Sequence, residues 1–398
     1  AADEIIAGKF RDQFITDVIQ GGAGTSMNMN MNEVIANRAN EILGGELGKY
    51  DRCHPNDHVN YGQSTNDVVP TAGKLTVQLL IKDLLTDLQY LYDTLQAKGE
   101  EFDHVIKMGR THLQDAVPIR LGQEFRAFSQ PVLRDIKRIS SAVEELTYVN
   151  MGATAVGTGI NADVEYVKNV VRILSEVTGF EFKQSSDLVD GTRNLDSFVW
   201  LSSALKTCAV NLSKTANDIR LMASGPKAGL AEILLPQQQP GSSIMPGKVN
   251  PVIPEVLNQV CFQIFGNDIT ITKAAEAGQL ELNVFEPVLF FNLFQSIEIL
   301  KNGIVTFIEN CLKGITAQEE NCKYWVDRSV GIITALNPHI GYKNAADIAK
   351  ESIRTGIPVA QIVLQRGLLS KEELDIILNP FEMTKPGIPG KALLKKKR

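Results

Sequence analysis

Apolar side chains recur at helical spacing over unusually long stretches of the chain. Residues Leu75 to Phe102 and Val199 to Ala223 place them three or four positions apart, which is the repeat of an amphipathic helix. Residues Pro251 to Ala277 and Pro287 to Leu312 are similarly long and rich in apolar residues. A helix of about 25 residues is roughly 38 Å long. Several such helices in one chain predict an all-α fold whose centre is a long helical bundle.

One of these segments is apolar on more than one face. It contains a dense apolar run made of Val288, Leu289, Phe290, Phe291, Leu293 and Phe294. A helix with apolar residues all round needs neighbours on every side, which a single chain does not readily supply. The pattern therefore favours a homo-oligomer that packs through the bundle.

From Gly331 onward the pattern changes to short helices joined by turns. One predicted helix ends at Thr355, and a second runs from Pro358 to about Arg366. Ser370-Lys371-Glu372-Glu373 has the form of a capping box that opens a third helix, and the tail from Pro380 is predicted to be irregular. We therefore divide the chain into the remainder of an N-terminal domain (1–65), the long-helix bundle (66–328), and a small helical C-terminal domain with a basic tail (329–398).

The balance of charge excludes nucleic acid as the main partner, because phosphate binding needs a basic face and the formal net charge is −6. The dense basic cluster Lys395 to Arg398 is either a solvated tail or a weak interaction tail. The five cysteines are odd in number, widely spaced and without metal-ligand spacing, so we expect reduced thiols in a cytoplasmic protein. No uninterrupted apolar run reaches the ~18 residues of a membrane span, and no secretory signal is visible, so no membrane is expected as a partner.

Three polar clusters are each predicted to precede a long helix. Gln63 to Asp67 stands before the first long helix, Gly109 to Asp115 stands before Pro118 and the helix after it, and Gly241 to Asn250 runs into Pro251. Asn250 and Pro251 suit the cap and the first position of that third helix. A helix N-terminus attracts anions, because its free N–H groups and its dipole point outward. One such cluster would be an ordinary cap, whereas three together indicate an acidic small molecule such as a dicarboxylate.

The third cluster also suggests reactivity. Two serines between glycines form a loop whose backbone can fold tightly around an oxygen, and Lys248 supplies a cation nearby. The chain lacks the Gly-x-Ser-x-Gly turn of esterases. A second glycine-rich stretch, Gly152 to Gly159, lacks the Lys-Ser/Thr of a phosphate loop and is interpreted as tight backbone packing.

The stretch GSSIMPGKVNP, Gly241 to Pro251, closely resembles the signature of the aspartase/fumarase superfamily. GTSMNMNMNE (Gly24 to Glu33), QSTND (Gln63 to Asp67) and GRTHLQDA (Gly109 to Ala116) resemble its other active-site segments, so the resemblance covers nearly the whole chain. It implies a homotetramer whose long helices form a central bundle and whose active sites are each assembled from three subunits. Family members usually carry several dozen residues before this point, so we expect the N-terminal domain to lack its start.

The resemblance also implies which residues act on the substrate. Ser242 would be the base, attacking as an alkoxide that loop amides and Lys248 stabilise. The carboxylates and amino group of the substrate would be held by Thr25, Ser64, Thr65, Asn66, Thr111, His112, Lys248 and Asn250. Glu255, just inside the following helix, would support His112. No metal or organic cofactor is implied.

The implied reaction is the reversible conversion of L-aspartate to fumarate and ammonia, through removal of a proton from carbon and an aci-carboxylate intermediate. The close alternative is a class II fumarase, which interconverts malate and fumarate. Thr25-Ser26, Thr65 and the stretch Ala277 to Asn283 resemble the ammonia-lyase branch, whereas His112 is common to both. The alternative from another class is a non-catalytic structural relative, against which the intact motifs argue.

Overall fold

The computed structural model describes residues 1–241, 244–245 and 247–396, with side chains to residue 394. The chain forms two compact units. The first comprises Ala1–Gln89, Arg134–Leu212 and Gln259–Gly303, and the second comprises Tyr90–Leu133, Ser213–Asn258 and Ile304–Arg398.

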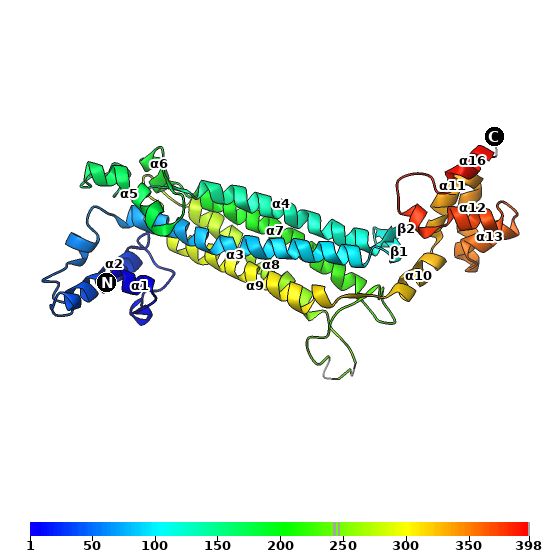
Figure 1. The fold of residues 1–398 in the computed structure, drawn as a ribbon, viewed down its shortest axis with the longest axis horizontal. Helices are drawn as coiled ribbons and strands as arrows, with labels where there is room; N and C mark the ends of the chain where they lie inside the picture. The colour runs from blue at the N-terminus through cyan, green and yellow to red at the C-terminus, as the bar shows by residue number, and fades with distance from the viewer. Residues whose placement is uncertain (242–243, 246, 397–398) are drawn as a thin grey trace. The chain divides into compact units, whose positions relative to one another are not determined.

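Five long helices dominate the fold (Figure 1). Each of them contributes one segment to each unit. They are α3 (Thr65–Glu101), α4 (Leu121–Glu145), α7 (Asp196–Met222), α8 (Val252–Glu276) and α9 (Glu286–Asn310). The four long apolar repeats correspond to α3, α7, α8 and α9, and the helix expected after Pro118 is α4. The prediction of an all-α fold with a long helical bundle is confirmed.

In the first unit, polar bonds join the helices around an apolar core. Asn211 of α7 donates to Asp135 of α4 at 2.9 Å, and Ser202 of α7 donates to Asp268 of α8 at 2.8 Å. Apolar side chains that are almost or completely inaccessible fill the space between the helices, among them Leu84, Leu88, Ile139, Leu201, Leu205, Ile264, Leu293 and Ile297. Burying one such side chain contributes about 1.5–3 kcal/mol. Packing, more than helix propensity, therefore holds these helices in place.

Shorter elements complete the first unit. They are α1 (Ala2–Ile6), η1 (Arg11–Gln13), α2 (Thr25–Ile42), η2 (Pro55–Val59), β3 (Tyr148–Val149), α5 (Val164–Thr178), β4 (Lys183–Gln184) and α6 (Leu188–Arg193). Strands β3 and β4 pair in parallel. The glycine-rich stretch after β3 packs as the sequence indicates, since a Cβ at Gly157 would lie 2.4 Å from the Cα atom of Val189.

Helix α3 begins at Thr65, inside the polar cluster that was expected to precede it. Pro70 lies in its second turn and has no N–H to give to the carbonyl of Asn66. That carbonyl accepts instead from the side-chain amide of Asn150, at 2.9 Å. A proline within a helix is tolerated here because another donor replaces the missing one.

In the second unit the GRTHLQDA stretch forms a β-hairpin and not the lead into a helix. Strand β1 (Ile106–Thr111) pairs antiparallel with β2 (Gln114–Arg120), with an irregularity in register between Met108 and Arg110. Pro118 lies in β2, and α4 begins only at Leu121. The expectation that this second cluster caps a helix is therefore wrong. A further short pair joins β5 (Ile233–Leu234) to β6 (Thr316–Ala317).

The C-terminal part of the second unit is made of short helices around a small core of its own. They are η3 (Leu312–Gly314), α10 (Glu319–Arg328), η4 (Val330–Ile332), α11 (Ile333–Ile340), α12 (Tyr342–Thr355), α13 (Val359–Gln365), α14 (Lys371–Ile377), α15 (Pro380–Met383) and α16 (Lys391–Lys396). Ser370 and Glu373 form the predicted capping box of α14. The tail, expected to be irregular, carries α15 and α16. The core of this region includes Val326, Leu336, Ile348, Ile362 and Ile377. The predicted boundaries between the three domains stay predictions.

Helix α9 is long and apolar enough, by length and composition, to cross a membrane if its C-terminal extension to Gly314 is counted. The central helix of a bundle meets the same criteria. Leu289, Leu293 and Ile297 are completely inaccessible within the first unit. Because one face of α9 is buried against neighbouring helices, its apolar composition is only weak support for a membrane-spanning role.

Candidate functional site

Four of the predicted substrate residues lie at two helix N-termini of the first unit. Thr25 is the first residue of α2, after Gly24 with a φ of 85°, and its hydroxyl donates to the carbonyl of Gly22 at 2.6 Å. Ser64 precedes α3, and its hydroxyl accepts from the N–H of Asn66 at 3.2 Å. The prediction that this cluster stands at a helix N-terminus is confirmed.

Side-chain amides connect α2 to α3. The amide of Asn28 donates to the hydroxyl of Thr65 at 3.0 Å. Asn28 and Asn32 of α2 both donate to the side-chain amide oxygen Oδ1 of Asn60, at 3.3 and 3.0 Å. Because Asn28 and Asn32 are buried, these bonds fix the hydroxyl of Thr65 relative to α2.

The carboxylate of Asp67 joins this segment to the glycine-rich stretch. It accepts from the N–H of Ser64 at 2.9 Å and from the N–H groups of Gly152 and Thr154 at 3.2 and 3.0 Å. Burial raises the pKa of Asp67, and the three N–H donors act in the opposite direction by favouring the ionised form.

Thr111 and His112 lie at the tip of the β1–β2 hairpin in the second unit, and both are exposed. His112 and Leu113 make the turn with φ angles of 53° and 59°, a conformation that few side chains adopt. Just below the tip, the hairpin is bonded to the C-terminal region. Ser329 donates to Asp115 at 2.7 Å.

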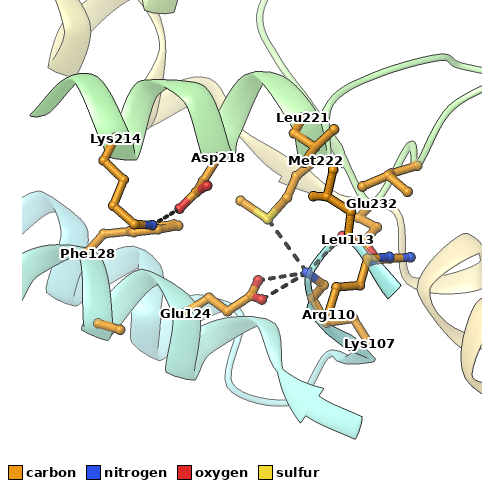
Figure 2. Close-up of a pocket in the computed structure, with 12 residues that line it drawn as sticks. Lys107, Arg110, Leu113, Glu124, Phe128, Lys214, Asp218, Leu221, Met222 and Glu232 are labelled. Atoms are coloured by element: carbon orange, nitrogen blue, oxygen red, sulfur yellow. Dashed lines mark hydrogen bonds and ion pairs between the residues drawn. The ribbon is translucent and has the colours of Figure 1, made fainter. Parts of the chain in front are cut away.

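Four buried or half-buried charges hold the hairpin below its tip (Figure 2). The carboxylate of Glu232, which is completely inaccessible, contacts Arg110 at 2.6 Å and Lys107 at 2.8 Å. Lys107 also pairs with Glu124, at 2.9 Å. Burial alone would lower the pKa of Lys107, but the two carboxylates raise it, whereas burial raises the pKa of Glu124.

These charges line a pocket of about 300 Å³ between α4, α7 and the hairpin, together with apolar Phe128, Leu221 and Met222. Its cations are already matched: Lys107 and Arg110 contact carboxylates, and Lys214 pairs with Asp218 at 2.5 Å. The pocket therefore supports the hairpin, and none of the described cations that line it is left unmatched for a dicarboxylate.

The predicted base, Ser242, lies outside the described residues, but the two ends of its loop are described. A Cβ at Gly241 would lie only 1.9 Å from the carbonyl oxygen of Lys248, so the backbones of these two residues are in close contact. Lys248 is exposed, and Asn250 lines a pocket of about 240 Å³ with Pro226 and Leu235. Helix α8 begins at Val252, one residue after the predicted start.

Glu255 lies in the first turn of α8, where Arg220 of α7 approaches it to 3.6 Å. Among the described residues of this unit no bond joins Glu255 to His112. The supporting role of Glu255 toward His112 stays a prediction.

Comparison with known proteins places the chain in a family. Residues 1–266 match the family described as Lyase, and residues 332–385 match the one described as Fumarase C C-terminus. The chain is 61% identical to aspartate ammonia-lyase of Bacillus subtilis (strain 168), over 100% of this chain and 83% of the relative. It belongs to the aspartase/fumarase superfamily.

Two further comparisons agree with that assignment. The chain is 52% identical to aspartate ammonia-lyase of Helicobacter pylori (strain ATCC 700392 / 26695), over 97% of this chain and 82% of the relative. The crystal structure of a fumarate lyase:delta crystallin from Brucella melitensis matches with a TM-score of 0.94 at 49% identity, covering 96% of this chain and 83% of that one. A class II fumarase from Schistosoma mansoni matches with a TM-score of 0.90 at 36% identity, covering 97% and 84%.

In this member of the aspartase/fumarase superfamily the predicted substrate residues are divided between the two units. Thr25, Ser64, Thr65 and Asn66 belong to the first unit, and Thr111, His112, Lys248 and Asn250 belong to the second. Their contacts with substrate stay predictions.

Two buried carboxylates that hold these residues, Asp67 and Glu232, were not predicted from the sequence as functional residues. A signal was present for Glu232, because it is the one charged residue in the apolar run from Leu230 to Leu235. A lone charge in such a run needs a buried partner.

Proposed function

We propose that this chain is an aspartate ammonia-lyase that converts L-aspartate reversibly to fumarate and ammonia. The observation that carries the proposal is the 61% identity, over the whole chain, to a protein with that name. In the forward direction the C–H electron pair at carbon 3 forms the new double bond. Ammonia leaves carbon 2 with the electrons of the C–N bond, and the proton passes to the base.

Ser242 is the proposed base. A proton on carbon next to a carboxylate is a very weak acid, and its removal places extra negative charge on that carboxylate. Donors aimed at this charge stabilise the transition state more than the ground state, often by ~3–4 kcal/mol each. The close contact of Gly241 with Lys248 supports the proposal, because it brings the two ends of the loop that contains Ser242 together.

The proposed assembly is a homotetramer in which three subunits build each active site. The long helices have outward apolar side chains in both units, among them Leu79, Trp200, Val210, Leu221, Phe262 and Ile269, with Phe262 57% and Ile269 66% exposed. Exposed side chains of this size on bundle helices favour association through those helices. Separate subunits would then supply the Thr25 and Ser64–Asn66 set, the Thr111–His112 set and the loop of Ser242.

A class II fumarase is the alternative function, and the comparisons do not favour it, although the chain matches one such enzyme with a TM-score of 0.90. The identity to that enzyme is 36%, against 61% to the ammonia-lyase of Bacillus subtilis. We also propose a cytoplasmic location without a membrane partner. Among the described residues no disulfide joins the five cysteines, four of which are buried, and this supports a reducing compartment.

The proposed function is tested by fumarate formation from L-aspartate, followed by ultraviolet absorbance. The parent protein should form fumarate, and Ser242→Ala should keep the fold and the affinity for substrate while losing nearly all turnover. Ser242→Ala activity within tenfold of the parent would remove Ser242 from the role of base. No fumarate from the parent would refute the ammonia-lyase itself.

A further inference from the structure

Asp67 is a completely inaccessible carboxylate to which the proposed chemistry gives no role. It lies in the first turn of α3, where one oxygen accepts from the N–H of Ser64 at 2.9 Å, as in an ordinary helix cap. Its other oxygen accepts from Gly152 and Thr154, more than 80 residues further along the chain. An ordinary cap needs only the first of these contacts.

The same stretch of chain holds the residues just before Asp67. The side-chain amide of Asn66 donates to the carbonyl of Ala155 at 2.7 Å. The carbonyl of Asn66, left without an N–H by Pro70, accepts from Asn150 at 2.9 Å. The turn that carries three predicted substrate contacts is thus held on both sides by residues 150–155.

We propose that Asp67, together with Asn150, is a positioning residue for the reaction. It ties the turn of Ser64, Thr65 and Asn66 to residues 150–155 and so sets where their polar groups meet the substrate. The inference rests on the proposed function, because that function assigns substrate contacts to this turn. Displacing a binding group by about 1 Å is enough to lower turnover by ~100-fold.

A carboxylate suits this position better than any neutral side chain. It offers two acceptor oxygens to three N–H donors, and bonds from N–H groups to an ionised acceptor are stronger than neutral ones. An asparagine has the same shape but only one acceptor oxygen. Turned toward Gly152 and Thr154, it would point its NH₂ group at the N–H of Ser64, so two donors would face each other without an acceptor. Asp67→Asn should therefore loosen the turn without leaving a cavity.

The test compares Asp67→Asn with Asp135→Asn, which changes another completely inaccessible carboxylate of the first unit. Asp135 accepts from Asn211 and Arg138, and among the described residues it has no bond to the turn. Kinetics on L-aspartate, thermal unfolding and amide hydrogen exchange of the turn are measured for both variants and the parent. A variant that is only destabilised has fewer active molecules, so its apparent kcat falls while its KM is unchanged.

We expect Asp67→Asn to raise the KM for L-aspartate by ~10-fold or more and to lower kcat as well. Amide exchange at Ser64 to Asn66 should become faster. Asp135→Asn should lower the unfolding temperature by a similar amount with KM and exchange at the turn unchanged. An unchanged KM in folded Asp67→Asn, or an equal rise in Asp135→Asn, overturns the inference.

If Asp67→Asn gives no folded protein, Asn150→Ala decides, because it removes the donor to Asn66 and leaves Asp67 in place. A raised KM with faster exchange at the turn supports the positioning role, and an unchanged KM overturns it. A parent that forms no fumarate from L-aspartate refutes the proposed function instead. In that case, amide exchange at the turn that is faster in Asp67→Asn alone would still support the role of Asp67 in holding the turn against residues 150–155. Equal amide exchange in all variants would overturn that role.

Discussion

The unfolding free energy of Glu286→Gln, measured relative to that of the parent, should increase as the pH rises from 5 to 7. Glu286 is the first residue of α9, is 1% exposed, and has one carboxylate oxygen without a hydrogen-bond partner among the described residues. Burial raises the pKa of its carboxyl to about 8, against the opposing effect of Lys74. In an unfolded chain the same group titrates near ~4.3.

Between these two pKa values the folded protein keeps a proton that the unfolded chain releases. The unfolding free energy of the parent therefore falls as the pH rises, by up to about 1.4 kcal/mol for each pH unit. Glutamine has nearly the same shape and cannot ionise, so the variant lacks this loss. The difference between Glu286→Gln and the parent should grow by roughly 2–3 kcal/mol from pH 5 to pH 7. Lys74, whose pKa burial lowers to about 8, titrates above this window.

The assay is guanidinium unfolding followed by far-ultraviolet circular dichroism, at one protein concentration and several pH values. The matched control is Glu281→Gln, at an exposed glutamate shortly before α9, and the difference from the parent should grow more for Glu286→Gln than for this control. A flat or falling difference for Glu286→Gln would refute the reasoning.

Three further predictions concern other parts of the structure. Gly241→Ala should abolish most turnover, because its Cβ would lie 1.9 Å from the carbonyl oxygen of Lys248. The control Gly266→Ala, which has open space around its Cβ in α8, should leave turnover unchanged, and equal activities of the two variants would contradict the prediction. Glu232→Gln should lower the unfolding free energy by about 3–5 kcal/mol, because Lys107 and Arg110 lose the buried carboxylate that they share. Glu165→Gln, at an exposed ion pair, is the control and should cost at most about 1 kcal/mol. A loss for Glu232→Gln no larger than that of the control would be contrary to expectation. Mixing inactive Ser242→Ala protein with inactive Thr111→Ala, His112→Ala protein under subunit exchange should restore some activity, and none in verified mixed tetramers would count against shared sites.

The long helices could be predicted because their periodic apolar faces are buried against one another. The repeat in Val199 to Ala223 falls within about three residues of α7 at either end. The polar cluster Gln63 to Asp67 was expected to precede the first long helix, but α3 begins inside it, at Thr65. Only the structure shows that Asn150 replaces the donor that Pro70 lacks.

The hairpin of Thr111 and His112 could not be predicted from local sequence. Tight two-residue turns normally use glycine or asparagine, yet His112 and Leu113 take positive φ angles here. Tertiary contacts hold the turn, since Glu232 lies far along the chain from Arg110. The motif residues themselves were identified from sequence, but the buried carboxylates of Asp67 and Glu232 gain their roles only from partners that the fold brings near.

The most direct test of the proposed reaction compares L-aspartate and L-malate as sole substrates. The two differ only in the amino or hydroxyl group on the carbon that loses its substituent, so the groups that hold both carboxylates should serve either one. We place the discrimination at Thr25, Thr65 and Asn66, whose oxygens can accept from an ammonium group. A site built to pair one polar group can reject the analogue without it by ~10⁴-fold. The account predicts rapid fumarate formation from L-aspartate and almost none from L-malate, and turnover of malate as fast as that of aspartate would contradict it.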